Sequence, residues 1–221
     1  MLGASRLSVD GVNGSYLLFV DGVPRVLVDP ASGTFERLLR GLDPQSIEQV
    51  LLTNLSIERT GDLPSFVRYR SGHGRTTALT GPDGSPGTAD FIDLLFGGDG
   101  AWSYVNDISG FKLNVRETPS SIAELAVFSI PVEPVLEELS VSLYGVAVPD
   151  GRLPAVAFRV ECGDESVVFA GDLTHSTASF VALAKRCSIL VHAGSVPRAG
   201  IDELAQRCGA KAVLVESKQP T

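Results

Sequence analysis

Two short stretches of this 221-residue chain concentrate side chains that could do chemistry. The first overlaps and follows the predicted strand 50–53, and the second follows the predicted strand 166–170. Their polar and ionisable residues are Asn54, Ser56, Glu58 and Arg59 in the first stretch, and Asp172 and His175 in the second. Carboxylates near an imidazole can exchange protons with a small substrate, and a guanidinium can bind an anion or pair with a carboxylate.

The elements that must position these residues follow from hydrophobic spacing and turn signals. Strands are expected at 16–20, 25–29, 50–53, 76–80, 112–116, 125–130, 141–148, 155–161, 166–170, 188–191 and 212–215. Helices are expected at 35–40, 63–70, 89–96, 177–187 and 201–208, the first with Thr34 as its N-cap. This order predicts an α/β (α+β) chain with two sheets packed face to face and helices outside. Nothing in the sequence is typical of a linker, so we expect one domain spanning 1–221.

Composition favours a soluble, cytoplasmic protein that binds neither nucleic acid nor membranes. A net charge of −8 argues against a surface for the phosphate backbone, which needs clustered Lys and Arg. No window reaches the roughly 20 apolar residues of a membrane span, and the first residues lack a signal-peptide pattern. The three Cys show no CxxC spacing, which favours a reducing compartment over a disulfide framework or a zinc ribbon.

The first stretch resembles the signature of a known family. Residues 51–63, Leu-Leu-Thr-Asn-Leu-Ser-Ile-Glu-Arg-Thr-Gly-Asp-Leu, are similar to the Thr-His-x-His-x-Asp-His run and the following Gly-Gly-Leu-Pro of the metallo-β-lactamase fold superfamily. Further segments resemble the family's motifs in the right order, at 13–29, 148–161, 166–172, 188–193 and 209–217. The Gly-Asp-Leu-Pro and His-Ala pieces are most similar to the ribonuclease Z and arylsulfatase-like branch. Asp150 and Asp172 are too close in sequence to hold the tRNA-gripping arm that is usual in ribonuclease Z.

The resemblance implies a four-layer αββα sandwich of two mixed sheets in which most metal ligands are replaced. The replaced positions are Asn54, Ser56, Glu58 and Arg59, where the family has His, His, Asp and His, and Asp150 and Ser217, where it has His. Asp172 matches the family's metal-bridging Asp. A catalytic zinc needs three protein ligands, usually with imidazole nitrogens among them, and no His remains at these positions. We therefore expect no dinuclear zinc site, no zinc hydrolysis by the family's mechanism and no bound cofactor.

Arg59 is the candidate replacement for the positive charge of the missing metal ions. A buried carboxylate without a partner is unfavourable or shifts its pKa upward. We predict that Arg59 pairs with Asp172, or with Glu58 or Asp150, through a bidentate contact. The alternative is that Glu58, Asp150 and Asp172 hold a hard ion such as Mg²⁺ or Ca²⁺ through their oxygens.

Several of these residues also have purely structural interpretations. The carboxylate of Asp172 could serve only to accept backbone hydrogen bonds in the Gly-Asp turn, and His175 could be an ordinary surface-loop residue. His192, at the end of an apolar strand, is expected to be a buried and hydrogen-bonded structural residue. Ser56 and Ser217 have no evident base partner, and the chain lacks a GxSxG elbow, so neither is expected to be a nucleophile.

Three functional hypotheses follow from the residues and the resemblance. The first is a non-hydrolytic binding or partner subunit, a pseudoenzyme that forms a homodimer or pairs with an active relative, as the resemblance allows. The second is a metal-independent enzyme that cyclises, isomerises or eliminates on a small organic substrate. Its catalytic candidates are Asp172, Arg59, Glu58, Asp150 and His175, and its substrate-binding candidates are Asn54, Ser56 and Ser217. The third is a residual metal-dependent hydrolase with an oxygen-rich site.

Overall fold

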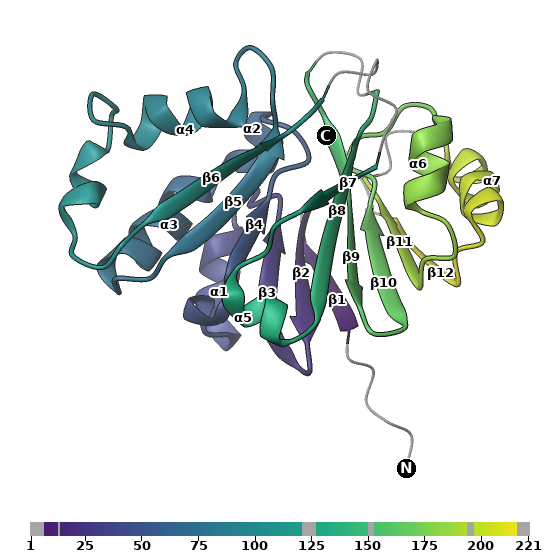
Figure 1. Ribbon diagram of the computed structural model, residues 1–221, viewed down its shortest axis with the longest axis horizontal. Coiled ribbons are helices and arrows are strands. Elements are labelled where there is room, and N and C mark those ends of the chain that lie inside the picture. Colours follow the sequence, from purple (N-terminus) through teal and green to yellow (C-terminus); the bar gives the residue numbers. More distant parts are fainter. Residues whose placement is uncertain (1–6, 13, 121–126, 150–152, 194–196, 216–221) are drawn as a thin grey trace.

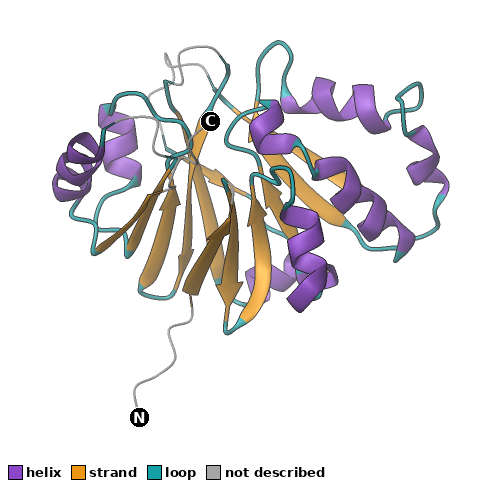
Figure 2. Cartoon of the chain, turned by 180° about the vertical axis from the view of Figure 1, so that it is seen from behind, coloured by secondary structure: helices purple, strands orange, loops and turns teal. Residues whose placement is uncertain are grey.

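The computed structural model describes residues 7–12, 14–120, 127–149, 153–193 and 197–215. Two six-stranded sheets pack face to face, and helices cover the outer face of each sheet (Figure 1). Figure 2 shows the same layers from behind, with helices on both sides of the sheets. The expected architecture of two mixed sheets between outer helices is therefore confirmed. None of the helices in the described residues has the length and the apolar character that crossing a membrane requires.

The first sheet comes from the first half of the chain and changes from antiparallel to parallel pairing along its width. Its strands, in spatial order, are β1 (Leu7–Val12), β2 (Ser15–Val20), β3 (Val23–Val28), β4 (Gln49–Leu51), β5 (Thr77–Pro82) and β6 (Leu113–Thr118). The pairs β1–β2 and β2–β3 are antiparallel, and the remaining pairs are parallel. The parallel strands are connected through helices, as parallel pairing requires.

The second sheet has the same mixed character and comes from the second half of the chain. Its strands, in spatial order, are β12 (Ala212–Val215), β11 (Ile189–His192), β10 (Glu165–Phe169), β9 (Val156–Cys162), β8 (Val141–Ala147) and β7 (Phe128–Ile130). The pairs β12–β11 and β11–β10 are parallel, and the others are antiparallel. Each sheet thus has a parallel part whose strands end at a common edge.

Two sets of helices form the outer layers. The helices α1 (Thr34–Gly41), α3 (Leu63–Gly72) and α4 (Thr88–Phe96) pack on the first sheet, whereas α6 (Ala178–Leu183) and α7 (Arg198–Cys208) pack on the second. The shorter helical segments are η1 (Pro44–Ser46), α2 (Ile57–Thr60), η2 (Ser103–Asp107) and α5 (Pro134–Glu138). The helix α2 is the short segment that carries the first chemistry-bearing stretch.

Strand alternation separates the inner core from the outer layers. In β2, Tyr16 and Leu18 belong to the core between the sheets, and the Tyr16 ring lies 5.8 Å from the ring of Phe169 in β10. Leu17, the residue between them, packs instead in the outer cluster that includes Leu38 of α1. Successive side chains of a strand point to opposite faces, so one apolar run serves both layers.

The structure corrects several element boundaries. The sequence prediction misses α2, α5 and η2, which are short and carry little periodic signal. It also misses β1, in which the Asp10-Gly11 pair is a turn signal within the strand. Thr34 is not the N-cap of α1: Gly33, with φ of +86°, holds that position, and the Thr34 hydroxyl hydrogen-bonds the hydroxyl of Ser15. The expected helix 177–187 already ends at Leu183, and Arg186 follows with a positive φ of +54°, which no α-helix continues.

Candidate functional site

The two chemistry-bearing stretches meet where β4 and β10 end. Residues 52–56 leave β4 toward α2, and residues 170–172 leave β10. The two stretches approach closely at Gly171, which has φ of +59° and where an added Cβ would lie 2.9 Å from the Cβ of the Thr53 side chain. Only glycine combines this backbone conformation with this proximity. Asp172, the next residue, is thereby placed beside the segment that carries Asn54 and Arg59.

Arg59 forms a bidentate ion pair with Asp172. Its Nε donates to Oδ2 of Asp172 at 3.1 Å, and its Nη2 donates to Oδ1 at 2.8 Å. Its Nη1 donates to the carbonyl oxygen of Gly14 at 3.0 Å. The Arg59 residue is only 6% exposed. Of the three pairings that the sequence suggested for Arg59, the one with Asp172 is confirmed.

Asn54 completes the polar environment of the Asp172 carboxylate. Its Nδ2 donates to Oδ2 of Asp172 at 3.1 Å, and its Oδ1 accepts from the backbone N–H of Ser56 at 3.0 Å. Ser56 precedes α2, and its carbonyl oxygen accepts from the hydroxyl of Thr60 at 2.9 Å. Asn54 therefore reaches the site through its side chain, whereas Ser56 fixes the start of α2 through its backbone.

Asp29 is a further member of this site that the sequence analysis treated only as the end of a strand. Its Oδ1 accepts from the backbone N–H of Thr53 and its Oδ2 from the Thr53 hydroxyl, both at 2.7 Å. Its Oδ2 also lies 4.0 Å from Nε of Arg59. Burial raises the pKa of Asp29 to about 7, although Arg59 and the Thr53 hydrogen bonds act in the opposite direction. A carboxylate at the end of an apolar strand, followed by Pro30, was the available signal.

Two of the remaining candidates, Glu58 and His175, have exposed side chains for which the described residues show no contact with the ion pair. Glu58 lies in the first turn of α2 and is exposed, whereas the neighbouring Arg59 is buried. His175 is also exposed, and its Nδ1 lies 3.2 Å from the hydroxyl of Thr174. Asp150 and Ser217 lie outside the described residues, so their places in the site stay predictions.

His192 ends β11 and is fully buried, as the sequence predicted for a structural histidine. Burial lowers the pKa of its imidazole, while the negative charge of Asp172 and a hydrogen bond with the backbone of Leu173 act in the opposite direction. A neutral imidazole is therefore favoured at this position.

The side chains around Asp172 do not fit a pair of zinc ions. Arg59 binds both oxygens of Asp172 and Asn54 binds Oδ2, so three of the roughly four acceptor sites of this carboxylate are engaged and too few remain to bridge two ions. Among the residues that the structure describes, no three His, Cys, Asp or Glu side chains lie grouped so that they could hold a metal ion. A guanidinium carries a permanent positive charge and offers donors but no acceptor. The Arg59 guanidinium therefore compensates the negative charge of Asp172 but provides no metal ligand.

Comparisons of the sequence find neither a matching family model nor a matching curated protein. Comparison of the structure finds solved proteins of similar architecture. The short form of human tRNase Z has a TM-score of 0.66 and 16% identity, and the match covers 96% of this chain and 89% of that one.

Two further solved structures share the architecture. The metallo-β-lactamase fold protein YhfI from Bacillus subtilis has a TM-score of 0.64 and 14% identity, with 94% of this chain and 79% of that chain covered. Zinc-bound PqqB from Methylobacterium extorquens has a TM-score of 0.53 and 15% identity, with 86% and 62% covered. Identities this low compare architecture alone, and at that level the chain has the metallo-β-lactamase fold.

Proposed function

We propose that this chain is a metallo-β-lactamase-fold protein without a dinuclear zinc site, and that it acts as a non-hydrolytic binding or partner subunit. The observation that supports this proposal is the bidentate pair of Arg59 with Asp172. A dinuclear hydrolytic site places two metal ions about 3.5–4 Å apart and keeps a position open for the attacking water. The Arg59 guanidinium binds the carboxylate that would have to bridge such ions.

The charges around Arg59 are consistent with a site that is stable without metal. Arg59 faces the carboxylate of Asp172 directly and the carboxyl group of Asp29 at 4.0 Å. Because the pKa of Asp29 is raised to about 7, this group is largely protonated under mildly acidic conditions. The single cation then balances the single remaining anion. A buried pair of this kind needs no further counter-ion.

Metal analysis together with a hydrolysis assay tests the proposal. Protein incubated with Zn²⁺ and then desalted is expected to retain far less than one zinc ion per chain. It is also expected to hydrolyse phosphodiester and β-lactam test substrates no faster than buffer does. A zinc-bound protein of the same fold serves as the positive control. Stoichiometric zinc together with hydrolysis that is lost in EDTA would overturn the proposal.

The partner part of the proposal is that the chain forms a homodimer or pairs with an active relative of the same fold. It is supported only by the combination of a retained fold with an altered site. Light scattering coupled to size-exclusion chromatography is expected to give twice the mass of one chain. A single-chain mass at every concentration would eliminate the homodimer and leave the pairing with a relative.

The proposal also includes a cytoplasmic location, which the state of the cysteines supports. Cys162, Cys187 and Cys208 are free and buried, and burial raises the pKa of the Cys187 thiol to about 11. Thiols of this kind are inert and persist in a reducing compartment. Titration with a thiol reagent is expected to detect three thiols per chain after denaturation and few before it. Fewer than three after denaturation would contradict the reducing location.

One observation favours the second candidate, a metal-independent enzyme. The side chain of Asp172 is 27% exposed, so a small molecule can reach the Arg59–Asp172 pair from solvent. Arg59 and Asn54 would then bind the substrate, while Asp172 would exchange a proton with it. A thermal-shift screen of small organic acids separates the candidates. A ligand whose stabilising effect is lost in Asp172→Asn but kept in Arg40→Met would favour the enzyme.

A further inference from the structure

A cavity of about 220 Å³ lies beside the loop that follows Asp172. It is open to solvent on one side and is bordered by this loop, the end of β11 and one face of α7. Its polar lining consists of Thr174, His175, Ser176, His192, Glu203 and Arg207. A pocket with several convergent polar groups is the usual form of a small-molecule site. None of these residues takes part in the Arg59–Asp172 pair.

Arg207 connects the two walls of this cavity. Its Nη1 donates to the hydroxyl of Ser176 at 2.8 Å, which holds the loop against the last turn of α7. Within the described part of the chain, the Arg207 side chain makes this one hydrogen bond. Its Nη2 and Nε atoms can therefore still donate to a ligand. A guanidinium presents its donors in a planar fork that matches a carboxylate or a phosphate group.

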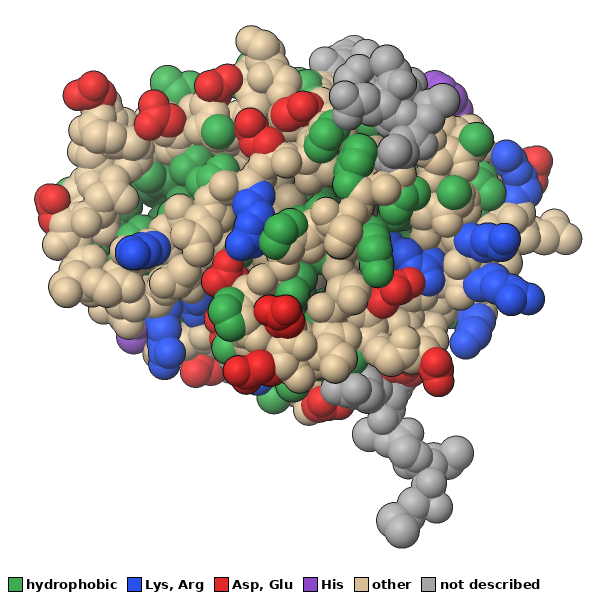
Figure 3. Space-filling view, in the orientation of Figure 1, with side chains coloured by type: hydrophobic (Ala, Val, Ile, Leu, Met, Phe, Trp, Pro, Cys, Tyr) green, Lys and Arg blue, Asp and Glu red, His purple; other side chains and the backbone are tan. Residues whose placement is uncertain are grey.

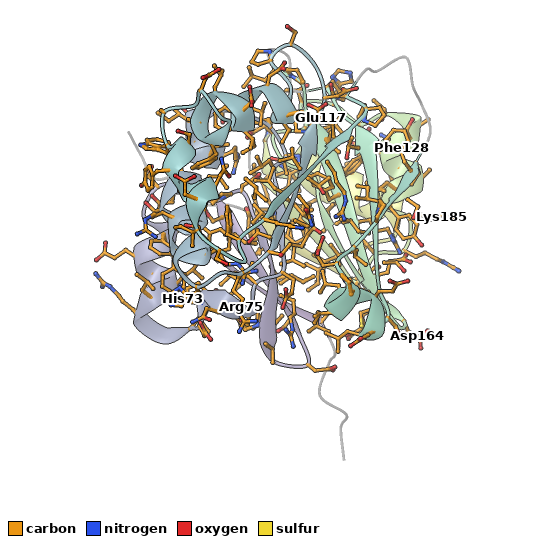
Figure 4. The ribbon with its side chains drawn as sticks, turned by 60° about the vertical axis from the view of Figure 1, so that its left-hand side comes forward. His73, Arg75, Glu117, Phe128, Asp164 and Lys185 are labelled. Carbon is orange, nitrogen blue, oxygen red and sulfur yellow. The ribbon has the colours of Figure 1, made fainter. Side chains whose placement is uncertain are left out.

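The surroundings of the cavity are positively charged although the chain as a whole is acidic. Residues 173–215 contain five Lys or Arg and only two Asp or Glu, whereas the net charge of the chain is −8. In Figure 3, Lys and Arg side chains gather at the end of the molecule where α6 and α7 lie, and most acidic side chains lie elsewhere on this face. Lys185, which follows α6, is on this side of the molecule (Figure 4). Such a local field attracts anions.

We propose that this cavity binds a small anion, a carboxylate or a phosphate ester that also carries a hydroxyl or ammonium group. Arg207 binds the anionic group, and the hydroxyl of Ser176 and a ring N–H of His175 donate to it. The Thr174 hydroxyl already donates to the carbonyl oxygen of Pro149 at 3.0 Å and serves to hold the loop. Glu203, one helical turn before Arg207 on α7, accepts from the hydroxyl or ammonium group. A ligand without a hydroxyl or ammonium group would place its negative charge near the Glu203 carboxylate and donate no hydrogen bond to it. This inference goes beyond the proposed function and holds whether or not the chain hydrolyses anything.

Histidine NMR signals test the proposal in the full-length protein. The probes are inorganic phosphate, glycolate and glycine, titrated at constant ionic strength, which compare a phosphate, a hydroxycarboxylate and an amino-carboxylate. The imidazole signals of His175 and His192 are expected to shift in a saturable way. His73 is the internal control, because it lies on the opposite side of the molecule from Lys185 (Figure 4). The proposal would be overturned if none of the three probes caused a saturable shift at concentrations up to about 10 mM, or if the His73 signal shifted equally.

Two arginines of the same helix separate specific binding from general electrostatic attraction. Arg207 lines the cavity, whereas Arg198, also exposed on α7, pairs with Asp202 at 2.9 Å. Arg207→Gln is expected to weaken binding of the preferred probe about tenfold or more, because it removes charge-assisted hydrogen bonds. Arg198→Gln, which removes the same charge, is expected to leave the dissociation constant within about twofold. Equal weakening by both variants would overturn the proposal.

A further variant keeps the test decisive if Arg207→Gln does not fold. His175→Ala changes an exposed loop residue and removes the imidazole donor from the cavity. It is expected to weaken anion binding by about threefold to tenfold, since one hydrogen bond to a charged group is lost. Unchanged binding in His175→Ala would contradict the assigned arrangement of donors.

Discussion

Arg59 and its two carboxyl neighbours form a cluster whose members depend on one another. Arg59 is bound to Asp172 through two hydrogen bonds and lies 4.0 Å from Asp29, which in turn is fixed by Thr53. Removing one partner of a buried ion pair leaves the other charge buried and uncompensated. The stability lost in this way is much larger than the stability that the intact pair contributes. The cluster should therefore tolerate the loss of both charges better than the loss of one.

Replacing Arg59 tests this dependence. Arg59→Met is expected to lower the free energy of unfolding by about 3 kcal/mol, because Asp172 loses its cation in a largely buried setting. The double variant Arg59→Met/Asp172→Asn is expected to recover part of this loss. Arg40→Met, which breaks the exposed pair of Arg40 with Glu36, is the control and should change stability by less than about 1 kcal/mol. Urea unfolding measures all three, and an equal loss in Arg59→Met and Arg40→Met would refute the argument.

The buried His192 predicts a specific pH dependence. Burial lowers the pKa of its imidazole in the folded protein, whereas the unfolded chain binds a proton near pH 6.5. Below that pH the unfolded state binds more protons, so the free energy of unfolding falls as the pH falls, by up to about 1.4 kcal/mol per pH unit. Asp29, whose pKa burial raises to about 7, contributes a slope of the opposite sign.

Comparison of variants isolates the contribution of His192. His192→Asn is expected to remove the acid-side loss of stability between pH 7 and pH 5.5, while the slope from Asp29 stays the same in both proteins. His175→Asn is the control, because His175 is exposed. Urea unfolding at four pH values in this interval gives the slopes. A His192→Asn slope that matches the wild-type slope would show that the imidazole is not held neutral.

At the scale of elements, the site depends on how closely β10 and β4 end beside one another. Gly171 leaves β10 with φ of +59°, and its neighbour across the sheets is Thr53. The backbone N–H of Val156 in β9 also donates to the carbonyl oxygen of Thr53 at 2.9 Å, which links the second sheet to the same residue. Thr53 cannot move aside easily because its hydroxyl is bound to Asp29. The contact between the two sheets therefore positions Asp172.

Two glycines with the same backbone conformation test this close approach. Gly171→Ala is expected to destabilise the protein by about 2–3 kcal/mol, since backbone strain and a clash with Thr53 act together. Gly163, in the turn between β9 and β10, has φ of +60° and open space where an added methyl group would lie, so Gly163→Ala should cost only about 1 kcal/mol. Urea unfolding gives both values. If the two variants lose the same stability, the contact with Thr53 does not constrain the site.

At the scale of the whole molecule, parallel strands of both sheets end at the site. There the Arg59 guanidinium is the counter-ion of Asp172. Stability should therefore not depend on metal. A protein that binds a ligand only in its folded state gains about 2.7 kcal/mol at a ligand concentration 100 times the dissociation constant. That gain would raise the melting temperature of a chain of this size by several degrees.

The expected effect of metal on thermal stability is correspondingly small. Neither dialysis against EDTA nor addition of about 0.1 mM Zn²⁺ should change the melting temperature by more than about 1 °C. This zinc concentration is about 100 times a dissociation constant of about 1 μM. Differential scanning calorimetry measures this, with Mg²⁺ and Ca²⁺ tested in the same way. A rise of several degrees with Mg²⁺ or Ca²⁺ would instead support the oxygen-rich ion site of Glu58, Asp150 and Asp172.

The sequence by itself determined the layered architecture and the loss of imidazole ligands. Apolar runs such as 166–170 and the turns between them specify strands locally, and the identity of Asn54 or Arg59 at a position needs no coordinates. It also narrowed the partners of Arg59 to three carboxylates. It did not predict the contribution of Asp29, because a carboxylate at a strand end gives no sign of what it faces.

Only the tertiary structure decided which of these residues meet. Arg59 and Asp172 are separated by more than a hundred positions and follow strands of different sheets, so their contact depends on how the sheets pack. The same packing leaves Glu58 in solvent and places His175 in the lining of the cavity that Arg207 also borders. Local propensity acts over a few residues, whereas these contacts arise from the register of the strands and the close approach at Gly171.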